Sequence, residues 1–184
     1  MNKKNKSLTK TELKLIDAGN QMKIALKHTE DEGIFRSCIN SFITLARSVT
    51  FVMQTESSYN KELASWYESQ MKQLKQLPIM QFFHKKRTYT IHLGHIEPTH
   101  STIPIKSIII NGKEEPTVGG VLTYWTFDDA KDTIPNSNGN VLQLCEEYFL
   151  ILKNLVRNWA IQKTIWDNPD WLNKGIFSKR KRKS

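Results

Sequence analysis

The chain has 184 residues, 39% of them hydrophobic, and a formal net charge of +9 at pH 7. This length and apolar content suffice for one buried core, so we expect one domain and exclude a wholly disordered protein. No run approaches the roughly 18 apolar residues of a membrane span, and no apolar segment follows the Lys-rich start, so neither membrane insertion nor secretion is indicated. The predicted compartment is the cytoplasm.

The positive charge lies at the two ends of the sequence. The first end holds Lys3, Lys4, Lys6 and Lys10, and the second holds Lys179, Arg180, Lys181, Arg182 and Lys183. These residues account for the whole excess of +9, so the body of the chain is neutral. Most such tails are only solvated, but flexible cations also attract polyanions in a salt-sensitive way. We predict basic tails at 1–8 and 176–184, with the second tail binding RNA.

Three helices are expected before residue 78. The first begins after Thr9, because Glu12 completes a capping box, and it runs to about His28. The second has the strongest pattern, since apolar residues recur at helical spacing from Phe35 to Met53. A third helix has one apolar face, formed by Leu63, Tyr67, Met71 and Leu74.

Two arginines and two cysteines on the predicted helices need separate interpretation. Arg36 and Arg47 lie on the second helix, where they are either solvated or further phosphate contacts. Cys38 and Cys145 fall on apolar stripes, where a free thiol packs as a small hydrophobe. Two cysteines form no disulfide framework, so we expect both to be reduced core residues.

The fourth helix carries the candidate catalytic residues. It is expected to begin at Pro78 and to stop before Gly94. Its apolar face ends at Phe83, and the following turns contain Arg87 and finish at His92. An arginine can hold a phosphate by paired N–H donors, and a histidine can transfer a proton near neutral pH. Arg87 and His92 are therefore the candidate catalytic pair for phosphodiester cleavage.

Helix geometry restricts how this pair could act. Five positions along a regular helix turn about 140° and rise about 7.5 Å, so Arg87 and His92 would not share a face of an intact helix. Fraying of the helix end, or a second copy of the motif in a symmetric dimer, would be needed to bring them together. The alternative role of His92 is structural, as a capping or hydrogen-bonded side chain.

The segment after the fourth helix predicts a β-hairpin. Two apolar stretches, 108–110 and 121–127, flank the turn signal Asn111-Gly112, so a hairpin is expected around 105–127. Tyr124 and Trp125 would point to opposite faces of the second strand. At most one of them could stack on a base, and packing against the helices is the favoured interpretation.

A closing helix follows the hairpin. Asn140 can cap it with Gln143 in the box position, and its apolar stripe extends to Trp159. Trp166 and Trp171 are expected to fold back on the bundle or onto a partner.

A zinc site is the alternative use of the histidines at and after the end of the fourth helix. The candidate ligands are His92, His95, Glu97 and His100. Without cysteines or a helical His-x3-His pair, this pattern is weak, and we predict no metal and no other cofactor.

The order of these elements resembles the HEPN family. Phe82-Phe83 lead into an Arg-x4-His-x-Gly motif made by Arg87, His92 and Gly94, and the third helix contains Trp66-Tyr67. The resemblance covers roughly residues 9 to 165. It supports a mainly α fold: a helical bundle of about five helices with a small inserted β-hairpin, in one domain over 9–175.

The resemblance also implies roles for residues of the motif. Arg87 would bind the phosphate and His92 would move the proton. We also predict that Thr88, Lys86 and Tyr89 support the site by orienting the substrate. Thr88 departs from the family pattern, because the residue after the arginine is often Asn there.

The implied function is a metal-independent endoribonuclease that leaves 2′,3′-cyclic phosphate ends. It would act as a homodimer with a composite site, as the RNA-cleaving effector of a toxin–antitoxin or anti-phage defence system controlled by an antitoxin or activating partner. Two alternatives stay open. One is an inactive scaffold that binds RNA or protein, and the other is a dimeric interaction protein whose basic tails contact acidic partners.

Overall fold

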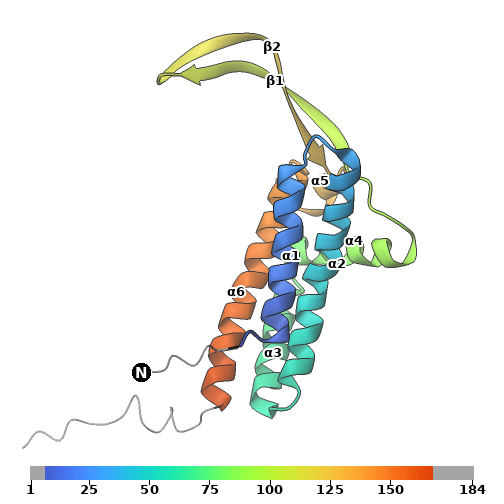
Figure 1. Cartoon of the computed structure of the whole chain (residues 1–184), viewed down its shortest axis with the longest axis vertical. Helices are drawn as coiled ribbons and strands as arrows, with labels where there is room; N and C mark the ends of the chain where they lie inside the picture. The colour runs from blue at the N-terminus through green and yellow to red at the C-terminus, as the bar shows by residue number, and fades with distance from the viewer. Residues whose placement is uncertain (1–6, 168–184) are drawn as a thin grey trace, which may run out of the picture.

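The computed structural model describes residues 7–167. Three long helices, α1 (Lys10–Lys27), α2 (Glu32–Ser57) and α6 (Val141–Asp167), run side by side along the molecule, with α3 (Lys61–Leu74) at one end (Figure 1). The remaining elements are α4 (Pro78–His92), β1 (Thr99–Ile110), β2 (Lys113–Thr126) and the short α5 (Ala130–Thr133). The predicted mainly α bundle with an inserted hairpin is confirmed. The described chain adds one short helix, α5, where we expected a polar loop.

Local capping signals set the starts of the helices. Thr9 and Glu12 form the expected capping box at α1, and Pro78 stands in the first turn of α4. Helix α2 begins before Phe35, because the side chain of Asp31 accepts a hydrogen bond from the backbone of Ile34 at 2.9 Å. The apolar repeat of the sequence begins only at Phe35, so it did not predict the first turn of α2.

Only one of the two hydrogen bonds of the expected capping box forms at the start of α6. The backbone N–H of Gln143 donates to Oδ1 of Asn140 at 3.0 Å. The side chain of Gln143 donates to Glu147 and does not close the box. Trp166 is partly buried against the core beside α3, while Trp171 lies outside the described residues.

Phe83 lies at the centre of an aromatic cluster that joins α2, α4 and α6. Its ring stacks on Tyr148 with centroids 4.4 Å apart and meets the edge of Phe42 at 6.4 Å. Phe82 and Phe127 also contact it, with ring centroids 5.3 and 6.4 Å away. Burial raises the pKa of Tyr148 to about 12, so its hydroxyl stays neutral. This cluster fixes the first turns of α4 against the bundle.

Both cysteines are free and buried, as expected. Cys145 has no exposed surface, and burial raises the pKa of its thiol. Burial likewise raises the pKa of Cys38. The two thiols therefore pack as core groups of α2 and α6.

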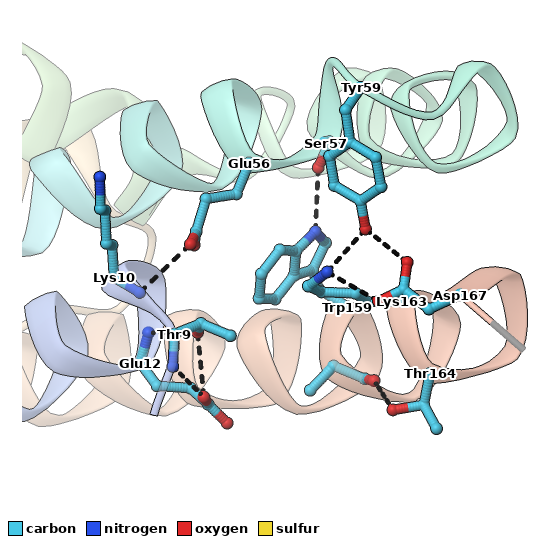
Figure 2. A network of polar contacts seen from close by, with 11 residues as sticks. Thr9, Lys10, Glu12, Glu56, Ser57, Tyr59, Trp159, Lys163, Thr164 and Asp167 are labelled. Atoms are coloured by element: carbon cyan, nitrogen blue, oxygen red, sulfur yellow. Dashed lines mark hydrogen bonds and ion pairs between the residues drawn. The ribbon is translucent and has the colours of Figure 1, made fainter. Parts of the chain in front are cut away.

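At the end of the bundle opposite the hairpin, polar contacts join α1, α2 and α6 (Figure 1 and Figure 2). The indole N–H of Trp159 donates to Oγ of Ser57 at 2.9 Å, within a second core cluster. The hydroxyl of Tyr59 donates to Asp167 at 2.7 Å and accepts from Lys163 at 2.6 Å. These bonds tie the end of α2 to α6.

Glu56 caps the first helix from a different helix. Its carboxylate accepts the backbone N–H groups of Lys10 and Thr11 at 3.2 and 3.0 Å and the Thr11 hydroxyl at 2.7 Å. The first N–H groups of a helix have no partner within it, and a carboxylate there also favours the helix dipole. Glu56 therefore holds α1 in place on α2.

We expect Glu56→Ala to lower the free energy of unfolding by about 1–2 kcal/mol, because two helix N–H groups and a buried hydroxyl lose their acceptor. Chemical denaturation followed by circular dichroism measures this loss. Glu146→Ala, at an exposed position of α6, is the control and should change stability by less than about 0.5 kcal/mol. Equal losses in the two variants would contradict the capping role.

The hairpin is longer than predicted. It begins at Thr99, and Asn111-Gly112 form the expected turn with positive φ values of 49° and 78°. The hydroxyl of Thr126 contacts those of Thr99 and Ser101 at 3.0 and 3.1 Å, which extends the pairing back to the bundle. These polar residues carried no strand signal, so the sequence placed the start near residue 105.

The base of the hairpin packs on the bundle and its outer part projects beyond it (Figure 1). Trp125 is buried, stacks on Phe35 with centroids 4.9 Å apart and donates to the carbonyl of Thr29 at 2.8 Å. The prediction that this strand packs an aromatic side chain against the helices is therefore confirmed for Trp125. Further out, the opposed pair Ile103 and Leu122 is exposed.

Among the described helices, none is long and apolar enough to cross a membrane. The predicted division into tails and one domain stays a prediction, because residues 1–6 and 168–184 are outside the described residues.

Candidate nucleic-acid interface

Helix α4 is unbroken from Pro78 to His92. Its end is fixed at the carbonyl of Tyr89, which accepts the backbone N–H groups of Leu93 and Gly94 at 2.8 and 3.2 Å. Gly94 has a φ of 136°, which favours glycine and confirms the expected stop. Fraying before His92 is therefore not seen.

The structure does not bring Arg87 and His92 together within one chain. Both belong to the same intact helix, and five helical positions separate their directions by about 140°. His92 is exposed, and its side chain forms no polar contact with any other described residue. The hydrogen-bonded structural role considered for His92 is thus not formed in the described part of the chain.

The predicted supporting residues have different surroundings. Lys86 forms an ion pair with Asp129 at 2.7 Å and lies over the rings of Phe82 and Phe127 at 5.2 and 5.0 Å. Thr88 donates its hydroxyl to the carbonyl of His84, one turn earlier in α4. Tyr89 is exposed. Lys86 therefore attaches α4 to the segment before α5, and its role toward a substrate stays a prediction.

Arg87 instead joins a cluster with Arg47 and Phe51, which we call the arginine cluster. The guanidinium carbons of Arg47 and Arg87 lie 4.5 and 5.9 Å from the centroid of the Phe51 ring. Arg47 also donates to the hydroxyl of Thr50. A cation is attracted to the face of an aromatic ring, so this ring holds two guanidinium groups from different helices near one point. Planar guanidinium groups held this way suit the oxygens of a phosphate.

A cavity of about 330 Å³ continues the arginine cluster between α2 and α3. Arg47 and Phe51 form one side of it, and α3 and the residue after it supply Lys72 and Lys75. Glu68 is the one acid among its lining residues. The cavity therefore has an excess of positive charge in a body whose overall charge is close to neutral.

Along α2, the residues before the arginine cluster line a groove of about 530 Å³, which we call the hydroxyl groove. Its polar lining includes Arg36, Ser37, Ser41, Thr44, Thr90 and His95. Arg36 also lies 3.6 Å from the carboxylate of Glu97. No carboxylate lines the groove itself in the described residues.

Asn40 fixes the floor of this groove. Its amide nitrogen donates to the carbonyls of Arg36 and Ile96 at 2.9 and 3.0 Å, and its oxygen accepts the N–H of Ile96 at 2.9 Å. The chain after α4 is thereby held against α2. This places His95 at the groove, while His92 stays outside it.

The zinc arrangement is not formed by the described residues. Within residues 7–167 no three His, Cys, Asp or Glu side chains lie close enough to hold a metal. His100 packs on Trp125 with ring centroids 3.5 Å apart, and Glu97 pairs with Arg36. The candidate ligands are therefore dispersed.

Sequence reasoning missed several residues of this interface. The sequence allows Arg36 and Arg47 as phosphate contacts, but it does not indicate Phe51, Lys72 or Lys75. The sequence could have indicated Phe51, because it stands four residues after Arg47 and off the apolar stripe of α2. Residues at this spacing are neighbours on the surface of a helix. The residues proposed as an RNA-binding tail, Lys179, Arg180, Lys181, Arg182 and Lys183, lie outside the described residues.

Comparison with known proteins corrects the family assignment. Residues 2–137 match the family model described as bacteriophage lambda protein ea47. Searches of curated proteins and of solved structures gave no match. The resemblance to the HEPN family was wrong, because it rested on one short motif and an order of elements that many helical proteins share. The ribonuclease reaction and the roles of Arg87 and His92 lose that support and stay predictions. Since the match covers well over half of the 184 residues, the chain belongs to the bacteriophage lambda ea47 family.

Proposed function

We propose that this protein binds RNA through its phosphate backbone at the arginine cluster. The observation that carries the proposal is the position of Arg47 and Arg87, which come from α2 and α4 and both lie at the ring of Phe51. Phe51 is 48% exposed, so the cluster is at the surface. A strand can therefore reach both guanidinium groups.

The surroundings of the cluster support an anionic ligand. Lys72 and Lys75 line the adjoining cavity, and Arg36 lines the groove formed by the preceding turns of α2. Single-stranded nucleic acids are held by a positive surface that follows the backbone, with aromatic side chains at intervals. Cations on both sides of an exposed phenylalanine match this description.

Cleavage of the bound RNA is a further proposal that needs a second copy of the chain. Arg87 and His92 diverge within one helix, so His92 of one copy would have to act beside Arg87 of another. A homodimer would supply this arrangement. RNA as the ligand also agrees with the predicted cytoplasmic location. Control by an antitoxin or an activating partner protein stays a prediction.

The test is binding of a fluorescent single-stranded RNA, measured by anisotropy in EDTA over a range of salt concentrations. Arg47→Gln with Arg87→Gln should weaken binding about tenfold or more, because two phosphate contacts are lost. The slope of log affinity against log salt should also fall by about 0.7 for each lost contact.

Arg157→Gln, an exposed arginine of α6, is the matched control and should bind as the parent does. Unchanged affinity and slope in the double variant would show that RNA binds elsewhere, for example at the tails. The same samples, run on a denaturing gel with His92→Ala alongside, show whether the RNA is cut and whether His92 is needed.

A further inference from the structure

The hydroxyl groove has a chemistry that differs from that of the arginine cluster. Its lining on α2 carries Ser37, Ser41 and Thr44 at intervals of three and four residues, so the three hydroxyls follow one face of the helix. At about 530 Å³, the groove is within the usual range for a small-molecule site. Such a lining fits a polar ligand with hydroxyl groups of its own.

Two of these hydroxyls are available to a ligand. Ser37 and Ser41 form no hydrogen bond with any other described residue, whereas Thr44 donates to the carbonyl of Asn40 at 3.0 Å. A serine hydroxyl can donate one hydrogen bond and accept two. Ser37 and Ser41 can therefore both give a hydrogen bond to a ribose hydroxyl and accept one from it.

The hydroxyl groove and the arginine cluster are adjacent on both helices that form them. On α2, Thr44 of the groove stands three residues before Arg47 of the cluster, and on α4, Thr90 stands three residues after Arg87. Three residues of helix rise about 4.5 Å and leave a difference of about 60° in direction. One ligand can thus contact both places.

Arg36 provides a cation at the groove itself. Its guanidinium is 3.6 Å from Glu97, beyond normal hydrogen-bond length, and the two side chains are 40% and 76% exposed. An ion pair this open contributes little, so a phosphate can replace Glu97 as the partner of Arg36. Along α2, Arg36 therefore precedes the serine hydroxyls and Arg47 follows them. This order matches the alternation of phosphate and sugar in a nucleic-acid strand.

We infer that the hydroxyl groove binds ribose and makes the protein select RNA over DNA. This inference rests on the proposed function. The 2′-hydroxyl of the nucleotide next to the arginine cluster is hydrogen-bonded by Ser37 and Ser41, and the following phosphate lies at Arg36. The 2′-hydroxyl is the group by which a protein distinguishes RNA from DNA at a given position.

The test compares the affinities of full-length protein for single-stranded RNA, DNA and 2′-O-methyl RNA of one sequence. The parent should prefer RNA to DNA by about tenfold, because the DNA lacks a hydrogen bond that the groove offers. Ser37→Ala with Ser41→Ala should remove this preference by weakening RNA binding while DNA binding is unchanged. Ser65→Ala with Ser69→Ala, an exposed pair at the same spacing on α3, should keep it.

The outcomes separate this inference from the proposed function. Equal affinity of the parent for RNA and DNA, with both lost in the Arg47 and Arg87 double variant, would overturn ribose selection and leave phosphate binding intact. A preference for RNA that survives in the serine variant would also overturn the inference. Binding that ignores the two arginines would overturn the proposed function and ribose selection together. Circular dichroism confirms that each variant is folded.

Discussion

Phe83→Ala is expected to lower the free energy of unfolding by about 3–5 kcal/mol. Phe83 is 1% exposed, and its ring is stacked on Tyr148 at 4.4 Å with further aromatic neighbours on α2, α4 and the segment after β2. Removing the ring leaves a cavity at the junction of three helices, and the rigid aromatic neighbours can fill little of it. Urea denaturation followed by circular dichroism measures the loss.

Two variants test whether the cavity is the cause. Phe83→Leu keeps much of the volume and should lose less than the alanine variant. His84→Ala changes the exposed neighbour of Phe83 in α4 and should stay within about 0.5 kcal/mol of the parent. A loss below about 1 kcal/mol for Phe83→Ala would mean that α4 is not held by this ring.

Asn40→Leu is expected to lower the free energy of unfolding by about 2–4 kcal/mol, because it leaves the buried N–H and carbonyl of Ile96 without partners. It should also release the segment between α4 and β1, which carries His95. Limited proteolysis followed by mass spectrometry should then show new cleavage between Leu93 and Pro98. The proposed preference for RNA over DNA should weaken as well, since the hydroxyl groove is lined by Asn40 and His95.

The matched control is Asn154→Leu, at an exposed position of α6. Its stability should be within about 0.5 kcal/mol of the parent, and its cleavage pattern should be unchanged. If Asn40→Leu costs no more than this control, the segment is held by other contacts.

The sequence predicted best those features of the fold that depend on neighbouring residues. The capping box at Thr9, the start of α4 at Pro78 and the turn at Asn111-Gly112 each arise within a few residues. The start of β1 at Thr99 could not be predicted, because its pairing depends on contacts with the distant Thr126. Glu56 was missed as a cap for a similar reason, since it stands on another helix.

The candidate site shows the same division. Arg87 was predicted from its residue type and its place at the basic end of the fourth helix, but its neighbours Phe51 and Arg47 become visible only when α2 and α4 are packed together. The pairing of Arg87 with His92 followed from a motif, whereas the unbroken helix directs the two side chains apart. A short motif defines residue types and spacing, and the direction of each side chain is set by the helix that carries it.

The projecting hairpin has one more consequence, which concerns self-association. A two-stranded ribbon leaves both outer edges unpaired, and such edges tend to recruit strands from other molecules and lead to aggregation. Here β1 contains Pro104 and β2 contains Pro116, each inside the pairing register. A proline has no N–H, and within a ladder it is tolerated where that group would face the outer edge or at a bulge. Each strand of the ribbon therefore contains one residue that cannot donate a backbone hydrogen bond to another strand, which lowers the tendency of the ribbon to form intermolecular sheets.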